Sequence, residues 1–137
     1  MKLILAAWLT LVLAWMWDRF LFLLGPALGI HEKRRVILLV PIGEEVFKYG
    51  VSYCSGIFPP VLFAFFGIGE GIYESAHLKH HLDPVLILAG ILPHTLFSIF
   101  YLFNIPVWLG LFLAIISHSI WNNLFFNFKN DCKRSTD

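Results

Sequence analysis

Two adjacent carboxyl groups, those of Glu44 and Glu45, lie inside an apolar run over residues 36–58. That run is long enough to cross a bilayer as a helix. A carboxylate in the hydrocarbon region costs several kcal/mol unless it is paired or faces water, so a segment that served only as an anchor would not carry two of them. Ionisable groups in such a segment indicate a functional site whose partners lie on neighbouring segments.

The chemistry open to such a pair is the activation of water. Two neighbouring carboxyl groups in a low-dielectric pocket cannot both ionise freely, so one of them would exchange a proton near neutral pH. His118 and Asn122 are four residues apart, share a helix face and could donate hydrogen bonds to a developing oxyanion. Together these groups suit hydrolysis of a peptide bond inside the membrane. The sequence has no Gly-x-Ser-x-Gly or His-Glu-x-x-His, which disfavours a serine or zincin mechanism.

The elements that would position these groups are membrane helices. Of the 137 residues, 58% are apolar and 14% are charged, against roughly 25% charged in soluble domains. Each of about five apolar runs is near the roughly 20 residues that cross the hydrocarbon, with Gly and Pro at the breaks. The runs cover residues 3–24, 36–58, 60–78, 84–103 and 106–126. We therefore predict an all-α fold, a membrane helical bundle in one domain, 1–137, with its motif-bearing core at 36–126.

The charges predict how this bundle is oriented. Basic residues follow the first, third and fifth runs, and the loops after the second and fourth runs carry no charge. Because cytoplasmic loops carry the excess of Lys and Arg, the N-terminus is expected outside and the C-terminus in the cytoplasm. The basic residues lie in short clusters at run ends and do not indicate nucleic-acid binding. They are Lys33, Arg34, Arg35, Lys79, Lys129, Lys133 and Arg134.

Polar residues of four successive runs fall at one depth. With a rise of about 1.5 Å per residue, Glu44 and Glu45 lie about 12–14 Å from the cytoplasmic end of their run. Glu70, His94 and His118 lie about 12–15 Å from the cytoplasmic ends of theirs. Scattered structural polar residues would not align in this way. The alignment predicts one polar chamber shared by the second to fifth helices.

Charged neighbours are expected to pair locally. Lys48 lies four residues after Glu44 and can pair with it, and we expect Lys48 to be a counter-charge for the acidic pair rather than a base. Asp18 and Arg19 are interpreted as an ion pair, or as an Arg that reaches the headgroups.

Small residues and a proline are expected to shape the chamber. Pro93 would kink the fourth helix next to His94 and free backbone groups for a polar site. Glycines around Glu70 would let the third helix approach the second. These glycines are Gly67, Gly69 and Gly71.

At this point the motifs resemble those of a known family, the PrsW-type proteases. These belong to the wider group of glutamic intramembrane proteases (CPBP) that includes the CAAX prenyl endopeptidases and bacteriocin-processing enzymes. The four motifs occur in the family's order and are Glu44-Glu45-x-x-Lys48, Phe66-x-x-x-Glu70, Pro93-His94 and His118-x-x-Trp121-Asn122.

The resemblance implies a catalytic role for each motif. Glu44 would be the general base on water, Glu45 would share or tune its proton, and Glu70 would help to hold the water. The remaining implied site residues are His118 and Asn122, as the oxyanion hole, and His94, as a support. The implied activity is an endopeptidase in the plasma membrane of a prokaryote that needs no cofactor and cleaves membrane-anchored proteins or peptides.

Two departures narrow the resemblance. The prenyl endopeptidases carry His where this chain has Glu70, and Arg one place beyond Lys48, where this chain has Tyr49. Both differences favour the PrsW branch of the group and weaken the case for a prenylated substrate.

Two other functions fit the same residues. His and carboxylate side chains could bind Zn²⁺ for metal-dependent hydrolysis, although no pair has the His spacing of metalloproteases. Buried acids and imidazoles also build proton or ion pathways, and a chain of this fold could serve as an interaction protein without activity.

Overall fold

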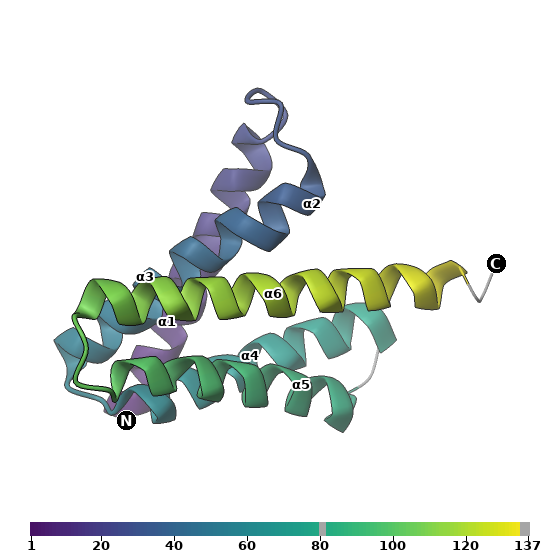
Figure 1. Cartoon of the computed structure of the whole chain (residues 1–137). Coiled ribbons are helices and arrows are strands. Elements are labelled where there is room, and N and C mark those ends of the chain that lie inside the picture. The colour runs from purple at the N-terminus through teal and green to yellow at the C-terminus, as the bar shows by residue number, and fades with distance from the viewer. Residues whose placement is uncertain (80–81, 135–137) are drawn as a thin grey trace.

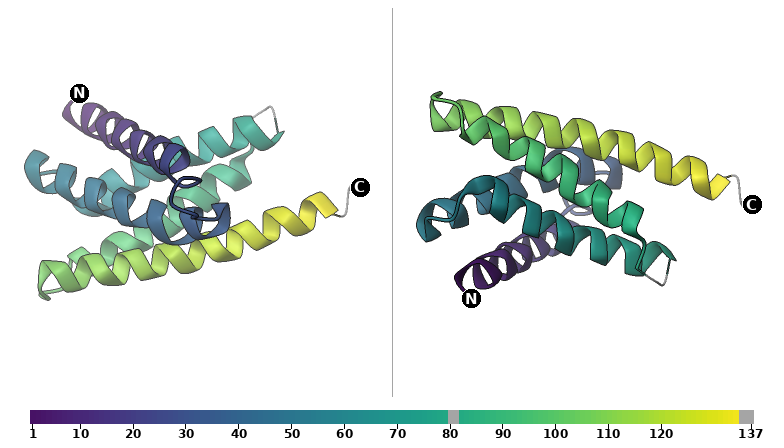
Figure 2. Two further views of the ribbon diagram at one scale, coloured as in Figure 1. Left: turned by 90° about the horizontal axis from the view of Figure 1, so that it is seen from above. Right: turned by 90° about the horizontal axis from the view of Figure 1, so that it is seen from below.

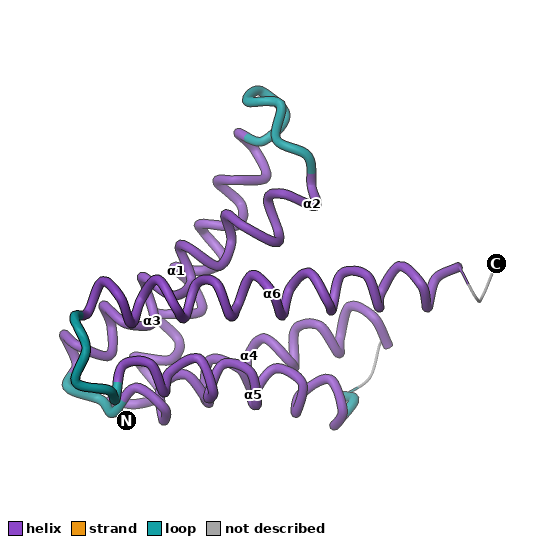
Figure 3. Tube along the Cα trace, viewed as in Figure 1, coloured by secondary structure: helices purple, strands orange, loops and turns teal. Residues whose placement is uncertain are grey.

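The computed structural model is built from helices joined by short turns (Figures 1 and 3). It describes residues 1–79 and 82–134, with side chains described for all of these except 78, 79 and 128–134. Within that part of the chain there is no β-strand, which confirms the predicted all-α class. The elements are α1 (Lys2–Leu24), α2 (Glu32–Arg34), the π-helical η1 (Arg35–Leu39), α3 (Val40–Ser55), α4 (Pro59–Lys79), α5 (Pro84–Phe97), the 3-10 helix η2 (Ser98–Tyr101) and α6 (Val107–Arg134).

Proline, glycine and one acid set the helix ends, much as the breaks in the sequence predict. α3 ends at Gly56, which has φ +63°, a conformation that favours glycine. α4 starts at Pro59, where a missing backbone N–H costs nothing. Asp83 caps α5, because its side chain accepts a hydrogen bond from the Val85 N–H at 2.9 Å.

The second helical stretch and α6 are longer than the apolar runs that predict them. Helix begins at Glu32 rather than at 36, and α6 continues past 126 to Arg134. The apolar pattern marks the part of a helix that faces hydrocarbon, whereas backbone hydrogen bonding continues where the side chains become polar. Apolar periodicity therefore underestimates the length of both helices.

A π-turn separates α2 from α3 and leaves one carbonyl without a backbone partner. The Val40 N–H donates to Arg35 O, five residues back. The next bond of this type would need an N–H at Pro41, which has none. The carbonyl of Val36 is thus free to accept a hydrogen bond from a side chain, and Asn122 of α6 donates one to it.

The helices run alternately in opposite directions, as predicted. The N-terminus, the α3–α4 turn and the α5–α6 turn lie at one end of the molecule, and the C-terminus lies at the other (Figures 1 and 2). α1 and α3 lie side by side, and both lean away from α6 toward the α1–α2 turn (Figure 1).

Three helical stretches are long and apolar enough to cross a membrane: α1, residues Pro84–Tyr101 and residues Val107–Asn127. The sequence predicts about five. In the described chain the two that fall short are α3, which is too short at 16 residues, and α4, which carries Glu70 and Glu74 and is less apolar for that reason. Large apolar side chains nonetheless face outward on every long helix, including Val46 of α3 and Phe65 of α4, as expected of an integral membrane protein.

The closest packing joins α4 to α5 rather than to α3, which corrects the prediction for the glycines around Glu70. A Cβ at Gly67 would overlap the backbone of Gly90, and one at Gly71 would overlap Ile87. Gly69 instead faces Leu11 of α1. Small residues do let a neighbour approach closely, as expected in a membrane, but the neighbour is α5.

Candidate functional site

Ionisable side chains from four helices meet in the interior. Glu44, Glu45 and Lys48 come from α3, His94 from α5 and His118 from α6, and all five are buried. Glu70 of α4 reaches the same cluster with 35% of its side chain exposed. The described structure thus brings together residues that the sequence places at one depth.

Lys48 and His118 hold Glu45 from two sides. Lys48 Nζ donates to Glu45 Oε1 at 2.5 Å, and His118 Nδ1 donates to the same oxygen at 2.9 Å. Lys48 is thus a counter-charge for the acidic pair, as predicted, but its partner is Glu45 rather than Glu44 four residues away. Both i+3 and i+4 neighbours can meet on a helix, and sequence spacing alone does not choose between them.

Lys48 also fixes the state of His94. An ammonium group has no lone pair, so the contact of 3.0 Å between Lys48 Nζ and His94 Nδ1 requires Nδ1 to accept. The proton of the neutral ring is therefore assigned to Nε2, which donates to Glu70 Oε2. Glu45, Lys48, His94 and Glu70 form one continuous hydrogen-bonded chain from the interior to the half-exposed carboxylate.

Aromatic rings close the remaining side of Lys48. Its Nζ lies 4.6 Å from the ring centre of Phe66 and 5.1 Å from that of Phe63. The ring face attracts a cation, so these contacts partly replace the water that the ammonium group has lost. The sequence analysis missed Phe63. The available signal was its spacing of three residues from Phe66, which places both on one face of α4.

Glu44 is buried but less constrained than its neighbour. Its Oε2 lies 3.6 Å from His118 Nε2 and has no hydrogen bond within the described residues. Because His118 uses its Nδ1–H for Glu45, the neutral ring directs the lone pair of Nε2 toward Glu44. A proton on Glu44 could pass to His118 over this short separation.

Asn122 lies one turn from His118, as predicted, and binds the carbonyl left free by the π-turn. Its Nδ2 donates to Val36 O at 3.0 Å. An amide nitrogen has two hydrogens, so a second donor of Asn122 stays available to another acceptor. The nearby carbonyl of Leu39 accepts a hydrogen bond from Trp17 Nε1 at 2.9 Å. Two side chains, Asn122 of α6 and Trp17 of α1, therefore donate hydrogen bonds to backbone carbonyls of η1.

A central cavity of about 870 Å³ opens onto the cluster. Residues from α1, α2, η1, α3, α4, α5 and α6 line it, among them Glu44, Glu70 and Asn122. Glu45 and Lys48 do not line it. Its apolar walls include Trp8, Leu11, Trp15, Phe66, Trp121 and Phe125. The cavity therefore leaves space for another molecule beside Glu44.

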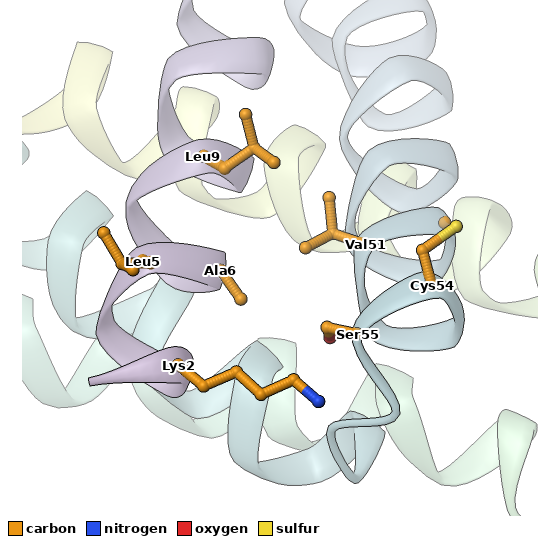
Figure 4. A pocket seen from close by; sticks show the side chains of 8 residues that line it. Lys2, Leu5, Ala6, Leu9, Val51, Cys54 and Ser55 are labelled. Atoms are coloured by element: carbon orange, nitrogen blue, oxygen red, sulfur yellow. The ribbon is translucent and has the colours of Figure 1, made fainter.

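A second hollow, of about 450 Å³, lies between α1 and α3 near the N-terminus (Figure 4). Its lining side chains, which include Lys2, Leu9 and Cys54, carry no acid and no imidazole. None of the clustered ionisable residues reaches it, so it does not belong to the candidate site.

The arrangement places groups that could activate water next to an open space. One carboxyl group, that of Glu44, faces the cavity with an imidazole lone pair beside it. The second carboxyl group, that of Glu45, does not line the cavity; its Oε1 accepts from two donors, and its buried Oε2 has no hydrogen bond within the described residues. Asn122 offers a donor at the cavity wall.

Comparison with known proteins gives no relative for this chain. No family model, no curated protein and no solved structure matches it.

Proposed function

We propose that the protein is an intramembrane endopeptidase in which Glu44 activates water to hydrolyse a peptide bond of a membrane-anchored substrate. The observation that carries the proposal is the position of Glu44: it is buried, lines the central cavity and lies 3.6 Å from a ring nitrogen of His118. The likeness of the four motifs to those of PrsW-type proteases supports the same assignment.

The reaction follows from the groups around the cavity. The Glu44 carboxylate takes a proton from water as the water oxygen bonds to the substrate carbonyl carbon. The second amide hydrogen of Asn122 is placed to stabilise the negative oxygen that forms. The proton on Glu44 then reaches the amide nitrogen of the substrate, directly or through His118 Nε2, and the C–N bond breaks. His118 donates to the oxyanion only after its Nε2 has gained that proton.

Glu70 and His94 act on the water rather than on the substrate. Glu70 lies partly exposed at the cavity wall and accepts a hydrogen bond from His94 Nε2. Its second oxygen can hold a water molecule beside Glu44. His94 keeps Glu70 in that orientation, and Lys48 keeps His94 in the required tautomer.

The decisive experiment compares cells that carry the wild-type protein with cells that carry Glu44→Gln. Membrane proteomes from the two are compared for fragments with new termini inside or beside apolar segments. Such fragments are expected only with the wild-type protein. Equal amounts of the same fragments with Glu44→Gln at matched protein levels would end the assignment of Glu44 as the base.

The proposed orientation places the N-terminus outside a prokaryotic plasma membrane. Cys54 is exposed and free at the end of the molecule that carries the α3–α4 turn, which is then the outer end. In intact cells a membrane-impermeant maleimide should label a Cys132→Ser variant, in which Cys54 alone remains, within minutes. Labelling that requires cell lysis would reverse the orientation.

A metal-dependent hydrolase is the second candidate, because one ligand atom from each of Glu44, His94 and His118 falls within 4.8 Å of the others. His and carboxylate groups are common zinc ligands. However, both ring nitrogens of His94 already have partners, in Lys48 and Glu70, so metal binding would require one of these contacts to break. We expect less than about 0.1 zinc per purified chain and full cleavage in the presence of EDTA. Stoichiometric zinc with chelator-sensitive cleavage would instead establish the second candidate.

A further inference from the structure

The lining of the central cavity changes from apolar to charged along its length. The apolar wall contributed by α1 ends in Asp18, and α4 continues from Glu70 to Glu74 and His77 along the same lining. Glu32 joins them from α2. Asp18 and Glu32 lie near the α1–α2 turn, and Glu74 and His77 lie in the last two turns of α4. All four line the same cavity, and we call this part of its lining the mouth.

The charge at this mouth is mainly negative. Among its lining residues Asp18, Glu32 and Glu74 are acidic, and Arg35 is the one Lys or Arg that lines the cavity within the described residues. The guanidinium group of Arg35 lies 4.9 Å from the ring centre of Phe22.

Arg19, the sequence neighbour of Asp18, does not balance it. Its guanidinium group lies over Trp15 and Phe22, and its side chain is exposed outside the cavity. The ion pair expected between Asp18 and Arg19 is thus not formed. Arg19 therefore does not neutralise Asp18, and the described lining of the mouth holds three acidic residues against one Arg.

An independent feature shows that the cavity is built to receive a polar group. Glu44 lines the cavity and is 7% exposed, and its buried Oε2 has no hydrogen bond to any described residue. A buried carboxyl oxygen of this kind needs a donor from a molecule inside the cavity. Apolar walls, a polar deep end and an acidic mouth together define the shape and charge of the occupant.

We propose that the cavity takes a polypeptide segment that is apolar at the cleaved bond and basic on its cytoplasmic side. The inference rests on the proposed function and names its substrate class. From Glu70 to His77 the helix rises about 10 Å. From Glu44 to Glu32 it rises up to about 18 Å. An extended chain covers these distances in about three to five residues. Lys or Arg about three to five residues beyond the cleaved bond would meet the acidic mouth.

Binding can be measured without cleavage in Glu44→Gln protein in dodecylmaltoside micelles. The probes are two dansylated peptides, each a Leu/Ala segment of about 16 residues, one followed by three Lys and the other by three Glu. Energy transfer from the protein's tryptophans, three of which line the cavity, reports binding. The Lys peptide should bind at least about tenfold more tightly at low salt, and the difference should shrink at high salt because ions screen the mouth.

A charge-matched pair of variants locates the effect. Glu32→Gln raises the net charge by one at the mouth and should reduce the preference for the Lys peptide several-fold. Leu28→Lys raises it by one on the α1–α2 turn, where Leu28 is 66% exposed and does not line the cavity, and should leave the preference unchanged. Equal affinity of the two peptides, an equal effect of both variants, or displacement of both peptides by zwitterionic lipid would overturn the proposal.

The proposed function fails in a different way. If the Lys peptide binds with the expected preference but the wild-type protein leaves it intact in liposomes, the substrate-binding cavity stands and the peptidase assignment falls. If the wild-type protein cleaves both peptides equally, the peptidase stands and the basic-flank preference falls.

Discussion

Glu44 and Glu45 are neighbours in the sequence and lie in different surroundings. Glu45 is fully buried, and its Oε1 accepts hydrogen bonds from Lys48 and His118. Glu44 lines the central cavity and accepts no hydrogen bond within the described residues. The Oε2 of Glu45 also lacks a hydrogen bond there, but Glu45 does not line the cavity. Successive residues point about 100° apart around a helix, so one helix can hold one carboxyl group in a closed network and direct the next toward an open space.

The difference separates structural from chemical roles. On the closed side every charge has a partner of opposite sign or a hydrogen-bond donor, and removal of one partner leaves the others buried without compensation. On the open side a water molecule or a substrate can supply the missing partner. We therefore expect the closed side to govern stability and the open side to govern activity.

The largest expected effect on stability comes from Lys48→Met. This change leaves the Glu45 carboxylate without its ammonium partner and His94 Nδ1 without its donor. A loss of about 3–5 kcal/mol in the free energy of unfolding is expected. It can be measured by SDS titration in mixed micelles, followed by circular dichroism.

A second variant checks that the loss arises from the pair. Adding Glu45→Gln to Lys48→Met removes the uncompensated charge and should restore part of the stability. A loss below about 1 kcal/mol for Lys48→Met alone would show that the Lys48–Glu45 ion pair is screened by water, as a surface pair is.

The next effect tests how α5 supports the closed side. In Gly90→Ala the new methyl group meets the backbone of Gly67, which must shift α5 and weaken the contact of His94 with Glu70. We expect a loss of about 1–3 kcal/mol in the same titration. Gly50→Ala is the control, because nothing lies within 4 Å of its new methyl group, and it should gain up to about 1 kcal/mol. Similar stabilities for the two variants would contradict the close α4–α5 contact.

A smaller loss is expected at Asn122, which lies between the two sides. Asn122→Ala removes the donor to Val36 O, and water from the cavity can replace it only in part. About 1 kcal/mol should be lost in the SDS titration. Asn123→Ala on the same helix has no recorded side-chain hydrogen bond to lose within the described residues and should change the stability by less than about 0.5 kcal/mol.

The smallest effect on stability is expected for Glu44→Gln. The amide is nearly the same size as the carboxyl group, and no protein hydrogen bond to its Oε2 is lost. Stability should change by less than about 0.5 kcal/mol, while cleavage should fall by about 10²–10⁴-fold. Parallel loss of folding and activity in this variant would remove the distinction between the two carboxyl groups.

Sequence patterns predicted the helices and the shared depth of the polar residues well. Gly, Pro and Asp83 set the helix boundaries through local geometry. The rise per residue sets the depth of a residue along its own helix, independently of how the other helices pack. Rotation of one helix against another is not local. The sequence therefore did not indicate that Glu45, rather than Glu44, takes Lys48, or that Gly67 faces α5.

The number of helices that cross the membrane stays a prediction, and the free carbonyl was missed. α3 is short, at 16 residues, and acidic residues make α4 less apolar, so a rule based on about 20 apolar residues describes both poorly. The π-turn at 35–39 has no compositional signal beyond Pro41, which also fits an ordinary first turn. The side chain that binds the free carbonyl, Asn122, lies 86 residues away in the sequence, on α6.

The π-turn also determines how α3 is rotated about its own axis. A turn of this kind holds one more residue than an α-helical turn, so it rotates the later part of the helix by about 100° relative to the earlier part. That angle equals the step from Glu44 to Glu45. Deleting a single residue from 35–39 would turn the later helix by this step, so that Glu45 would take the place of Glu44 at the cavity and Glu44 the place of Gly43 against Trp17. The spacing between the α1–α2 turn and the acidic pair therefore specifies which carboxyl group lines the cavity.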